Sequence, residues 1–181
     1  MNSFDQATFE NFNTAPGYYR QNSLLKALNA AHAFAVGTDR WLWIYGNSGV
    51  GKTHLCYAVR NYLRRSRQQV NLISFYEMIP WLRDQSPNRE RKYEAFLQTE
   101  ILILDDIHWL YRPDNALDNQ AHQILTDILS VRHFNRYSTL LVSLQKPETL
   151  LANFAALIAS TCDFVEIEAP DYRRRPSDEK K

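Results

Sequence analysis

The sequence lacks the features that mark secreted and membrane-spanning proteins. It contains two cysteines, Cys56 and Cys162, which lie far apart and show no metal-ligand spacing. This pattern favours two buried thiols in a reducing compartment. No stretch approaches the ~18 consecutive apolar residues of a membrane span, and the first residues lack the charged start and apolar run of a signal peptide. We therefore expect a cytoplasmic protein with no membrane partner.

Neither sign of charge dominates the chain. Its 21 lysines and arginines stand against 20 aspartates and glutamates, for a formal net charge of +1. Overall charge therefore indicates no particular partner. The 181 residues are 45% apolar, which suits one compact domain with a sizeable core. We predict an N-terminal arm at residues 1–21, a core at 22–170 and a charged tail at 171–181.

Short apolar runs alternate with amphipathic stretches along the core. Strands are predicted at residues 41–45, 70–75, 101–104, 139–143 and 164–167. Helices are predicted at residues 22–36, 52–67, 76–84, 89–97, 118–134 and 147–159. The fifth of these helices is expected to bury an apolar face that includes Leu129 and Val131. The alternation predicts an α/β fold whose parallel sheet is covered on both faces, and which binds ligands at the carboxyl ends of its strands.

A phosphate-binding motif follows the first predicted strand. Its residues are Gly46, Asn47, Ser48, Gly49, Val50, Gly51, Lys52 and Thr53. Glycines leave backbone N–H groups free to point at a polyphosphate, and the next helix offers its positive N-terminus. Lys52 is placed to reach the β- and γ-phosphate oxygens, and the Thr53 hydroxyl to bind Mg²⁺. A glycine-rich turn with an incidental lysine is the alternative, but the flanking strand and helix favour nucleotide binding.

Two aspartates, Asp105 and Asp106, follow the third predicted strand. Mg²⁺ prefers oxygen ligands and often takes one carboxylate from the protein, so Asp105 is the candidate metal ligand together with Thr53. Asp106 points the other way if strand geometry continues. Asp106 and Lys52 are the candidate catalytic residues, with Asp106 orienting or deprotonating the attacking water. Such a pair alone is more typical of a turn or a helix cap, but the upstream phosphate loop favours the metal site.

Five short segments together resemble one family. They read TFENF at 8–12, GNSGVGKTH at 46–54, ILILDDI at 101–107, KPE at 146–148 and APD at 169–171. In this combination the chain resembles the AAA+ group of DnaA replication initiators, DnaC helicase loaders and IstB transposition helpers. The phosphate loop alone is common to many ATPases, but its combination with TFENF, GKTH and LDDI is more specific.

The resemblance implies a three-layer αβα P-loop NTPase core with a five-stranded parallel sheet, here without the helical lid domain that follows in the family. It also implies ATP or ADP and Mg²⁺ as ligands. The implied partners are a replication initiator, a replicative helicase or a transposase protein. Single-stranded or double-stranded DNA and further copies of the chain are implied as additional partners.

The family pattern also places residues near the nucleotide base. Phe9, Asn11 and Phe12 of the TFENF segment are implied to seat the adenine, although anchoring of the arm explains them equally well. His54 fits the pattern directly after Thr53 and is a further candidate for the nucleotide site. Packing or a local hydrogen bond is the simpler explanation for His54.

Three departures from the family bear on hydrolysis. The polar sensor expected after the fourth strand aligns with Leu144, with Gln145 as the alternative. Residues 156–162, where the family carries an arginine finger, contain no arginine. We also expect no lid with its sensor arginine. Because an arginine at the transferred phosphate contributes ~10³–10⁵ in rate, we expect slow hydrolysis.

The leading hypothesis is an ATP-binding accessory ATPase of the DnaA/DnaC type. It would act in DNA replication or transposition through nucleotide-dependent partner binding, with weak ATP hydrolysis. One alternative is a non-hydrolysing nucleotide-binding adaptor, which the missing arginines favour. A less favoured alternative is a small P-loop kinase, against which the adjacent aspartates and the lack of an arginine-rich lid count.

Overall fold

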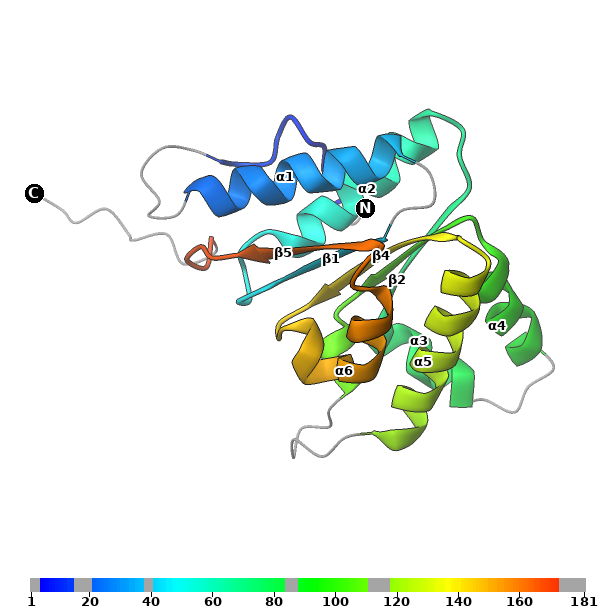
Figure 1. Ribbon diagram of the computed structural model, residues 1–181. Helices are drawn as coiled ribbons and strands as arrows, with labels where there is room; N and C mark the ends of the chain where they lie inside the picture. Colours follow the sequence, from blue (N-terminus) through cyan, green and yellow to red (C-terminus); the bar gives the residue numbers. More distant parts are fainter. Residues whose placement is uncertain (1–3, 15–20, 38–40, 84–87, 111–117, 173–181) are drawn as a thin grey trace, which may run out of the picture.

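The computed structural model describes residues 4–14, 21–37, 41–83, 88–110 and 118–172 (Figure 1). Parts of the predicted arm (1–3 and 15–20) and most of the predicted tail (173–181) lie outside these described residues. None of the helices within the described ranges is long and apolar enough to cross a membrane.

Five parallel strands form a single sheet. They are β1 (Trp41–Gly46), β2 (Val70–Ser74), β3 (Ile101–Asp105), β4 (Ser138–Ser143) and β5 (Cys162–Ile167), in the order β2-β3-β4-β1-β5. Every neighbouring pair is parallel, which confirms the predicted five-stranded parallel sheet. β5 begins earlier than predicted, because Cys162 already pairs with Trp41 at the start of β1.

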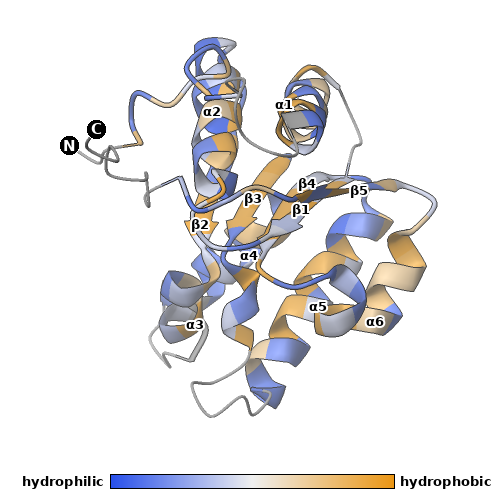
Figure 2. Ribbon diagram, turned by 90° about the vertical axis from the view of Figure 1, so that its left-hand side faces the viewer, coloured by the Kyte–Doolittle hydropathy of each residue, from blue (hydrophilic) through white to orange (hydrophobic). Residues whose placement is uncertain are grey.

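Helices cover both faces of the sheet. α1 (Gln21–Val36) and α2 (Lys52–Arg65) lie on one face. The other face carries α3 (Phe75–Arg83), α4 (Asn88–Gln98), α5 (Asn119–Phe134) and α6 (Pro147–Ile158). Figure 2 shows the sheet enclosed between these two helical layers. The three layers confirm the predicted αβα core.

Successive strand residues contribute to two separate cores. Leu42 and Ile44 pack with α1 and α2 in one core, whereas Trp41 and Trp43 pack with the helices of the other face. All four side chains are buried, because a sheet covered on both faces needs apolar residues on both sides. Trp43 also donates from Nε1 to Oγ of Ser143 at 2.9 Å, which satisfies its buried polar atom.

The prediction for α5 is wrong near its C-terminal end. Val131, which was expected to face inward, is 39% exposed, whereas Arg132 is fully buried. The buried stripe runs through Leu125, Ile128 and Leu129, and helical spacing of i, i+3, i+4 and i+7 carries it to position 132. A pattern of apolar residues does not reveal that position 132 is buried, because its side chain is charged.

Arg132 is accommodated by hydrogen bonds at the amino edge of the sheet. Its guanidinium donates to the carbonyl oxygens of Phe96 at 2.8 Å, Thr99 at 2.7 Å and Ser138 at 2.7 Å. Its Nε donates to Oγ1 of Thr139 at 3.0 Å. Burial lowers the pKa of Arg132 to about 9. The side chain therefore ties α4, α5 and β4 together.

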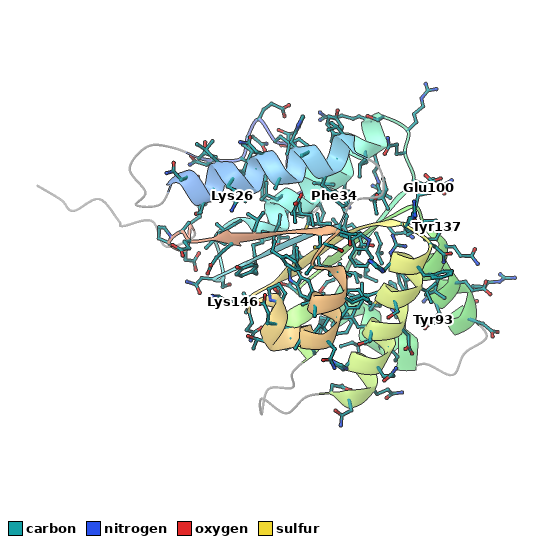
Figure 3. The ribbon with its side chains drawn as sticks, in the orientation of Figure 1. Lys26, Phe34, Tyr93, Glu100, Tyr137 and Lys146 are labelled. Atoms are coloured by element: carbon teal, nitrogen blue, oxygen red, sulfur yellow. The ribbon has the colours of Figure 1, made fainter. Side chains whose placement is uncertain are left out.

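The two edges of the sheet carry different features. Glu100 and Tyr137 precede β3 and β4 at the amino edge, and Lys146 follows β4 at the carboxyl edge (Figure 3). The phosphate loop also follows β1 at the carboxyl edge, where Asp105 ends β3 and Asp106 comes directly after it. This architecture binds ligands there, so the carboxyl edge holds the candidate site.

Candidate functional site

The phosphate loop connects the end of β1 to the start of α2. Gly46 has a φ of +144°, and a Cβ at this position would collide with the carbonyl oxygen of Ile167 in β5. Gly51 has a φ of +100°, and a Cβ there would lie 2.7 Å from the ring of Phe12. Both positions therefore need glycine. The loop is fixed between β5 on one side and the arm on the other.

Lys52 is the first residue of α2 and is only 6% exposed. Its Nζ donates to the carbonyl oxygens of Gly46 and Asn47, each at 2.8 Å, so the side chain lies back along the loop. A buried ammonium beside the N-terminus of a helix is an arrangement that favours phosphate binding.

Asp105 lies at the end of β3, next to Thr53 of α2. It is buried, accepts the backbone N–H of Asp106 at 2.9 Å, and is hydrogen-bonded to the Thr53 side chain. Burial, and then the charge of Asp106, raise the pKa of Asp105 from 3.8 to about 6. A divalent cation would relieve this electrostatic cost. Asp105 and Thr53 therefore fit a Mg²⁺ ion that also binds nucleotide phosphates.

The protein groups alone do not form a closed metal site. Within the described ranges, no group of three or more His, Cys, Asp or Glu side chains is placed to hold a metal ion. Mg²⁺ commonly binds through one or two protein oxygens together with phosphates and waters. The pair of Thr53 and Asp105 agrees with that mode of binding.

Asp106 departs from strand geometry. Its φ is +56°, so the alternation of side chains stops after Asp105, and Asp106 lines the pocket instead of pointing away from the site. Its carbonyl oxygen accepts the N–H of Trp109 at 3.2 Å, within the short 3₁₀ helix η1 (Ile107–Leu110). A left-handed conformation is uncommon for a residue other than glycine and occurs often at functional sites.

A pocket of about 560 Å³ lies over the phosphate loop. Its polar lining includes Lys52, Thr53 and Asp106, and its apolar lining includes Leu24 and Pro170. Most of the predicted loop residues also line it: Ser48, Gly49, Val50 and Gly51. This volume suits a ligand of nucleotide size. The pocket therefore combines groups for a polyphosphate with groups for an aromatic base.

The TFENF segment is divided between the core and the pocket. Phe9 lies in the core, with its ring centroid 5.2 Å from that of His32 on α1. Asn11 and Phe12 line the pocket. The side chain of Asn11 also accepts the N–H of Thr8 at 2.8 Å, which fixes the turn of the arm. The position of Phe9 agrees with the anchoring alternative, and contact of Phe9 or Asn11 with a base stays a prediction.

His54 joins α2 to the arm. Its Nε2 lies 3.0 Å from the carbonyl oxygen of Thr8, and its ring centroid lies 5.4 Å from that of Phe12. His54 also lines the pocket. These contacts agree with a local hydrogen bond, and a direct contact with nucleotide stays a prediction.

Tyr172 and His108 complete the site without having been predicted as part of it. The N–H of Tyr172 donates to the carbonyl oxygen of Gly49 at 2.9 Å, and its hydroxyl accepts a hydrogen bond from Nδ2 of Asn13 at 3.3 Å. His108 lines the pocket near Asp106. Their only sequence signal is position, because Tyr172 directly follows the APD segment and His108 directly follows the LDDI segment.

Leu144 is the residue that the family resemblance aligns with the expected polar sensor, with Gln145 as the alternative. It lines the pocket and contributes no polar side-chain atom. The neighbouring Gln145 accepts the hydroxyl of Ser143 at its backbone carbonyl, at 2.6 Å. This part of the pocket wall therefore offers an apolar side chain where a polar one was expected.

Comparison with known proteins identifies one family. The model of the bacterial DnaA ATPase domain matches residues 4–162. The chromosomal replication initiator protein DnaA of Tropheryma whipplei strain Twist is 28% identical over 176 residues, which cover 93% of this chain and 35% of that protein. The chain spans about a third of the length of the curated relatives that it matches.

Two solved structures share the fold. AMPPCP-bound DnaA from Aquifex aeolicus has a TM-score of 0.71 at 20% identity, with 90% of this chain and 49% of that structure covered. The DnaC helicase loader has a TM-score of 0.72 at 18% identity, with 93% and 100% covered. At these identities the likeness shows the fold alone, which is that of a P-loop NTPase core.

Proposed function

The chain belongs to the bacterial DnaA ATPase-domain family, and on this premise we propose that it is an ATP-binding accessory ATPase of DNA replication or transposition. In this proposal ATP or ADP, with Mg²⁺, occupies the pocket over the phosphate loop, and the bound nucleotide sets the affinity for a protein partner. One observation carries the proposal: Lys52 is buried in a glycine-rich loop at the N-terminus of α2, where it lines the pocket.

The polar groups of the phosphate loop and of the aspartate pair each have a role in this proposal. Backbone N–H groups of the loop and the ammonium of Lys52 bind the phosphates. Thr53 and Asp105 would hold Mg²⁺, which when bound neutralises phosphate charge. Asp106 orients the attacking water. Apolar lining residues, with Phe12 among them, surround the base.

Slow hydrolysis is part of the proposal because, among the residues that the structure describes, the pocket lining contains no arginine that would stabilise a transferring phosphoryl group. Leu144 presents an apolar side chain to the pocket, and residues 156–162 contain no arginine. An arginine at this step contributes ~10³–10⁵ in rate. A chain of this kind is suited to act as a nucleotide-dependent switch.

A non-hydrolysing adaptor is the second candidate, and the apolar Leu144 in the pocket is the observation that favours it. In such a protein ATP stabilises the form that binds the partner and is not consumed. The site groups that bind phosphate would be the same, so binding measurements alone do not separate the two candidates.

The proposed partners follow from the family. A replication initiator or a replicative helicase is supported by family membership and by the shared fold with a helicase loader. A transposase partner rests on the sequence resemblance to the IstB group. DNA and further copies of the chain are proposed as additional partners.

The test is ATP binding and turnover by the purified chain, with and without single-stranded DNA, against Lys52→Ala as the blank. Binding that is lost in Lys52→Ala, with slow turnover raised by DNA, supports the accessory ATPase. Binding without turnover supports the adaptor. A wild-type chain that binds no ATP contradicts both.

A further inference from the structure

His108 is a pocket residue whose chemistry the proposed roles do not use. It lies on η1 and lines the pocket with Asp106. Its Nδ1 is 3.7 Å from Oδ1 of Asp106, slightly beyond hydrogen-bond length. This nitrogen is buried and has no hydrogen-bond partner among the residues that the structure describes. A buried polar atom left unpaired is costly and calls for an explanation.

The ring of His108 is held in place by packing. Its centroid lies 5.6 Å from that of Trp109, with the two ring planes 31° apart. The Asp106 carboxylate lies at one edge of the ring. A shortening of less than an ångström would convert this contact into a hydrogen bond, and such bonds are often long in sites without substrate.

The neutral form of His108 is favoured, and a neutral imidazole can accept a hydrogen bond. Burial, and the charge of Lys52 to a smaller degree, lower the pKa of His108 against the opposing effect of Asp106. A neutral imidazole has one N–H and one acceptor nitrogen. If Nδ1 carries the proton and donates it to Asp106, Nε2 is the acceptor. A carboxylate that fixes the tautomer of a histidine in this way is a recurring catalytic arrangement.

We propose that His108 is a catalytic residue of ATP hydrolysis: its Nδ1–H donates to Asp106, and its Nε2 accepts a hydrogen bond from the attacking water. This proposal rests on the proposed function and specifies how Asp106 acts. Asp106 is then a positioning residue, which orients the water through His108. His108 brings a polar side chain to the same pocket, to which Leu144 contributes none.

In the hydrolysis step, each bond formed, each bond broken and the transferred proton can be assigned to a named group. The water oxygen forms the new bond to the γ-phosphorus, and the bond from that phosphorus to the bridging oxygen breaks with its electron pair going to ADP. The water proton passes to Nε2 of His108, and the Asp106 carboxylate stabilises the imidazolium that results. The proton then leaves to solvent, which restores the neutral ring.

The test compares three variants in single-turnover hydrolysis of Mg-ATP, with AMPPCP affinity measured in parallel. His108→Leu introduces an apolar side chain of similar bulk, His108→Ala removes the ring, and His108→Gln restores an acceptor. We expect the Leu and Ala variants to lose about 10²-fold to 10⁴-fold in rate, with AMPPCP affinity within about threefold of the wild type. His108→Gln should retain more activity than either. His122→Gln on α5 is the matched control and should behave as the wild type.

A double variant tests whether the two residues act as a unit. Asp106→Ala combined with His108→Ala should lose no more rate than the larger single loss, because groups that act together are not additive. Losses that multiply would contradict the pairing and overturn the proposal.

The remaining outcomes separate this proposal from the proposed function. A wild-type rate in His108→Leu overturns the role of His108 while leaving ATP binding intact. The role of His108 is also overturned, with nucleotide binding intact, if the wild-type chain binds AMPPCP but shows no hydrolysis above the Lys52→Ala blank. A wild-type chain that does not bind AMPPCP overturns the proposed function and the role of His108 together.

Discussion

The backbone N–H of Tyr172 donates a hydrogen bond to the carbonyl oxygen of Gly49 at 2.9 Å. This bond joins the chain after β5 to the middle of the phosphate loop. The Tyr172 hydroxyl accepts a second hydrogen bond from Asn13 of the arm at 3.3 Å. The loop is therefore braced by residues from both ends of the described chain.

Removing the Tyr172 donor should weaken nucleotide binding. Tyr172→Pro has no backbone N–H, and one such hydrogen bond contributes about 0.5–1.5 kcal/mol. We expect AMPPCP affinity to fall about twofold to tenfold in isothermal titration calorimetry. Tyr172→Phe keeps the bond to Gly49 and loses only the hydroxyl contact, so its affinity should fall less. Equal affinity of Tyr172→Pro and the wild type would show that the bond does not support the site.

Lys52→Ala should abolish tight ATP binding. The ammonium is the charged donor of the loop, and charge-assisted hydrogen bonds to phosphate are among the strongest in proteins. We expect a loss of about a hundredfold in affinity, measured with a fluorescent ATP analogue. Lys26→Ala, on the exposed side of α1, is the matched control and should bind as the wild type does. Tight binding by Lys52→Ala would contradict the assignment of the pocket.

Asp105→Asn should stabilise the nucleotide-free protein near neutral pH. The pKa of Asp105 is raised to about 6, so between about pH 4 and pH 6 the folded protein binds more protons there than the unfolded chain does. The free energy of unfolding therefore falls as pH rises through this range, by up to about 3 kcal/mol. The asparagine side chain does not titrate, so the variant does not lose this free energy of unfolding. It should also bind Mg-ATP more weakly, because the proposed carboxylate ligand of Mg²⁺ is gone.

Urea denaturation of wild type and Asp105→Asn across this pH range measures the effect. The difference in unfolding free energy should be largest above pH 6 and should shrink toward pH 4. Asp163→Asn, an exposed position on β5, controls for a general change of charge. A difference that does not vary with pH would show that Asp105 titrates normally in the folded protein.

Arg132→Met should destabilise the fold without removing a group from the pocket. The substitution leaves the carbonyl oxygens of Phe96, Thr99 and Ser138 without their buried donor. We expect a loss of about 3 kcal/mol in the free energy of unfolding. Arg91→Met on the exposed side of α4 should cost far less. AMPPCP affinity, measured at a temperature where the variant is folded, should stay near the wild-type value.

Local patterns were sufficient to predict the sheet and the phosphate loop. Apolar strand runs and the glycine spacing around Lys52 are signals that neighbouring residues carry, and both reappear in the structure. Asp105 was proposed as a metal ligand on the same kind of signal, because it ends an apolar strand, and that role stays a prediction. Its burial and raised pKa came only with the structure, since they depend on the packing of α2 against β3.

The parts that were not predicted depend on contacts between distant residues or on local backbone geometry. The bond from Tyr172 to Gly49 joins two segments that no short motif relates. Arg132 has a charge that conceals its place on the buried stripe of α5, because its partners are backbone carbonyls without a sequence signature. Asp106 adopts a φ of +56°. Its side chain therefore does not follow the alternating directions of strand residues, from which it was predicted to point away from Asp105.

Phe4 and Tyr172, the first and last described residues, both line the nucleotide pocket. Phe4 also stacks on Tyr57 of α2, with ring centroids 5.3 Å apart. A purification tag or fluorescent protein fused directly at either residue would therefore lie beside the pocket. Affinities are best measured after such tags are cleaved. For the same reason, an environment-sensitive dye attached beside Phe4 would serve as a direct reporter of nucleotide occupancy.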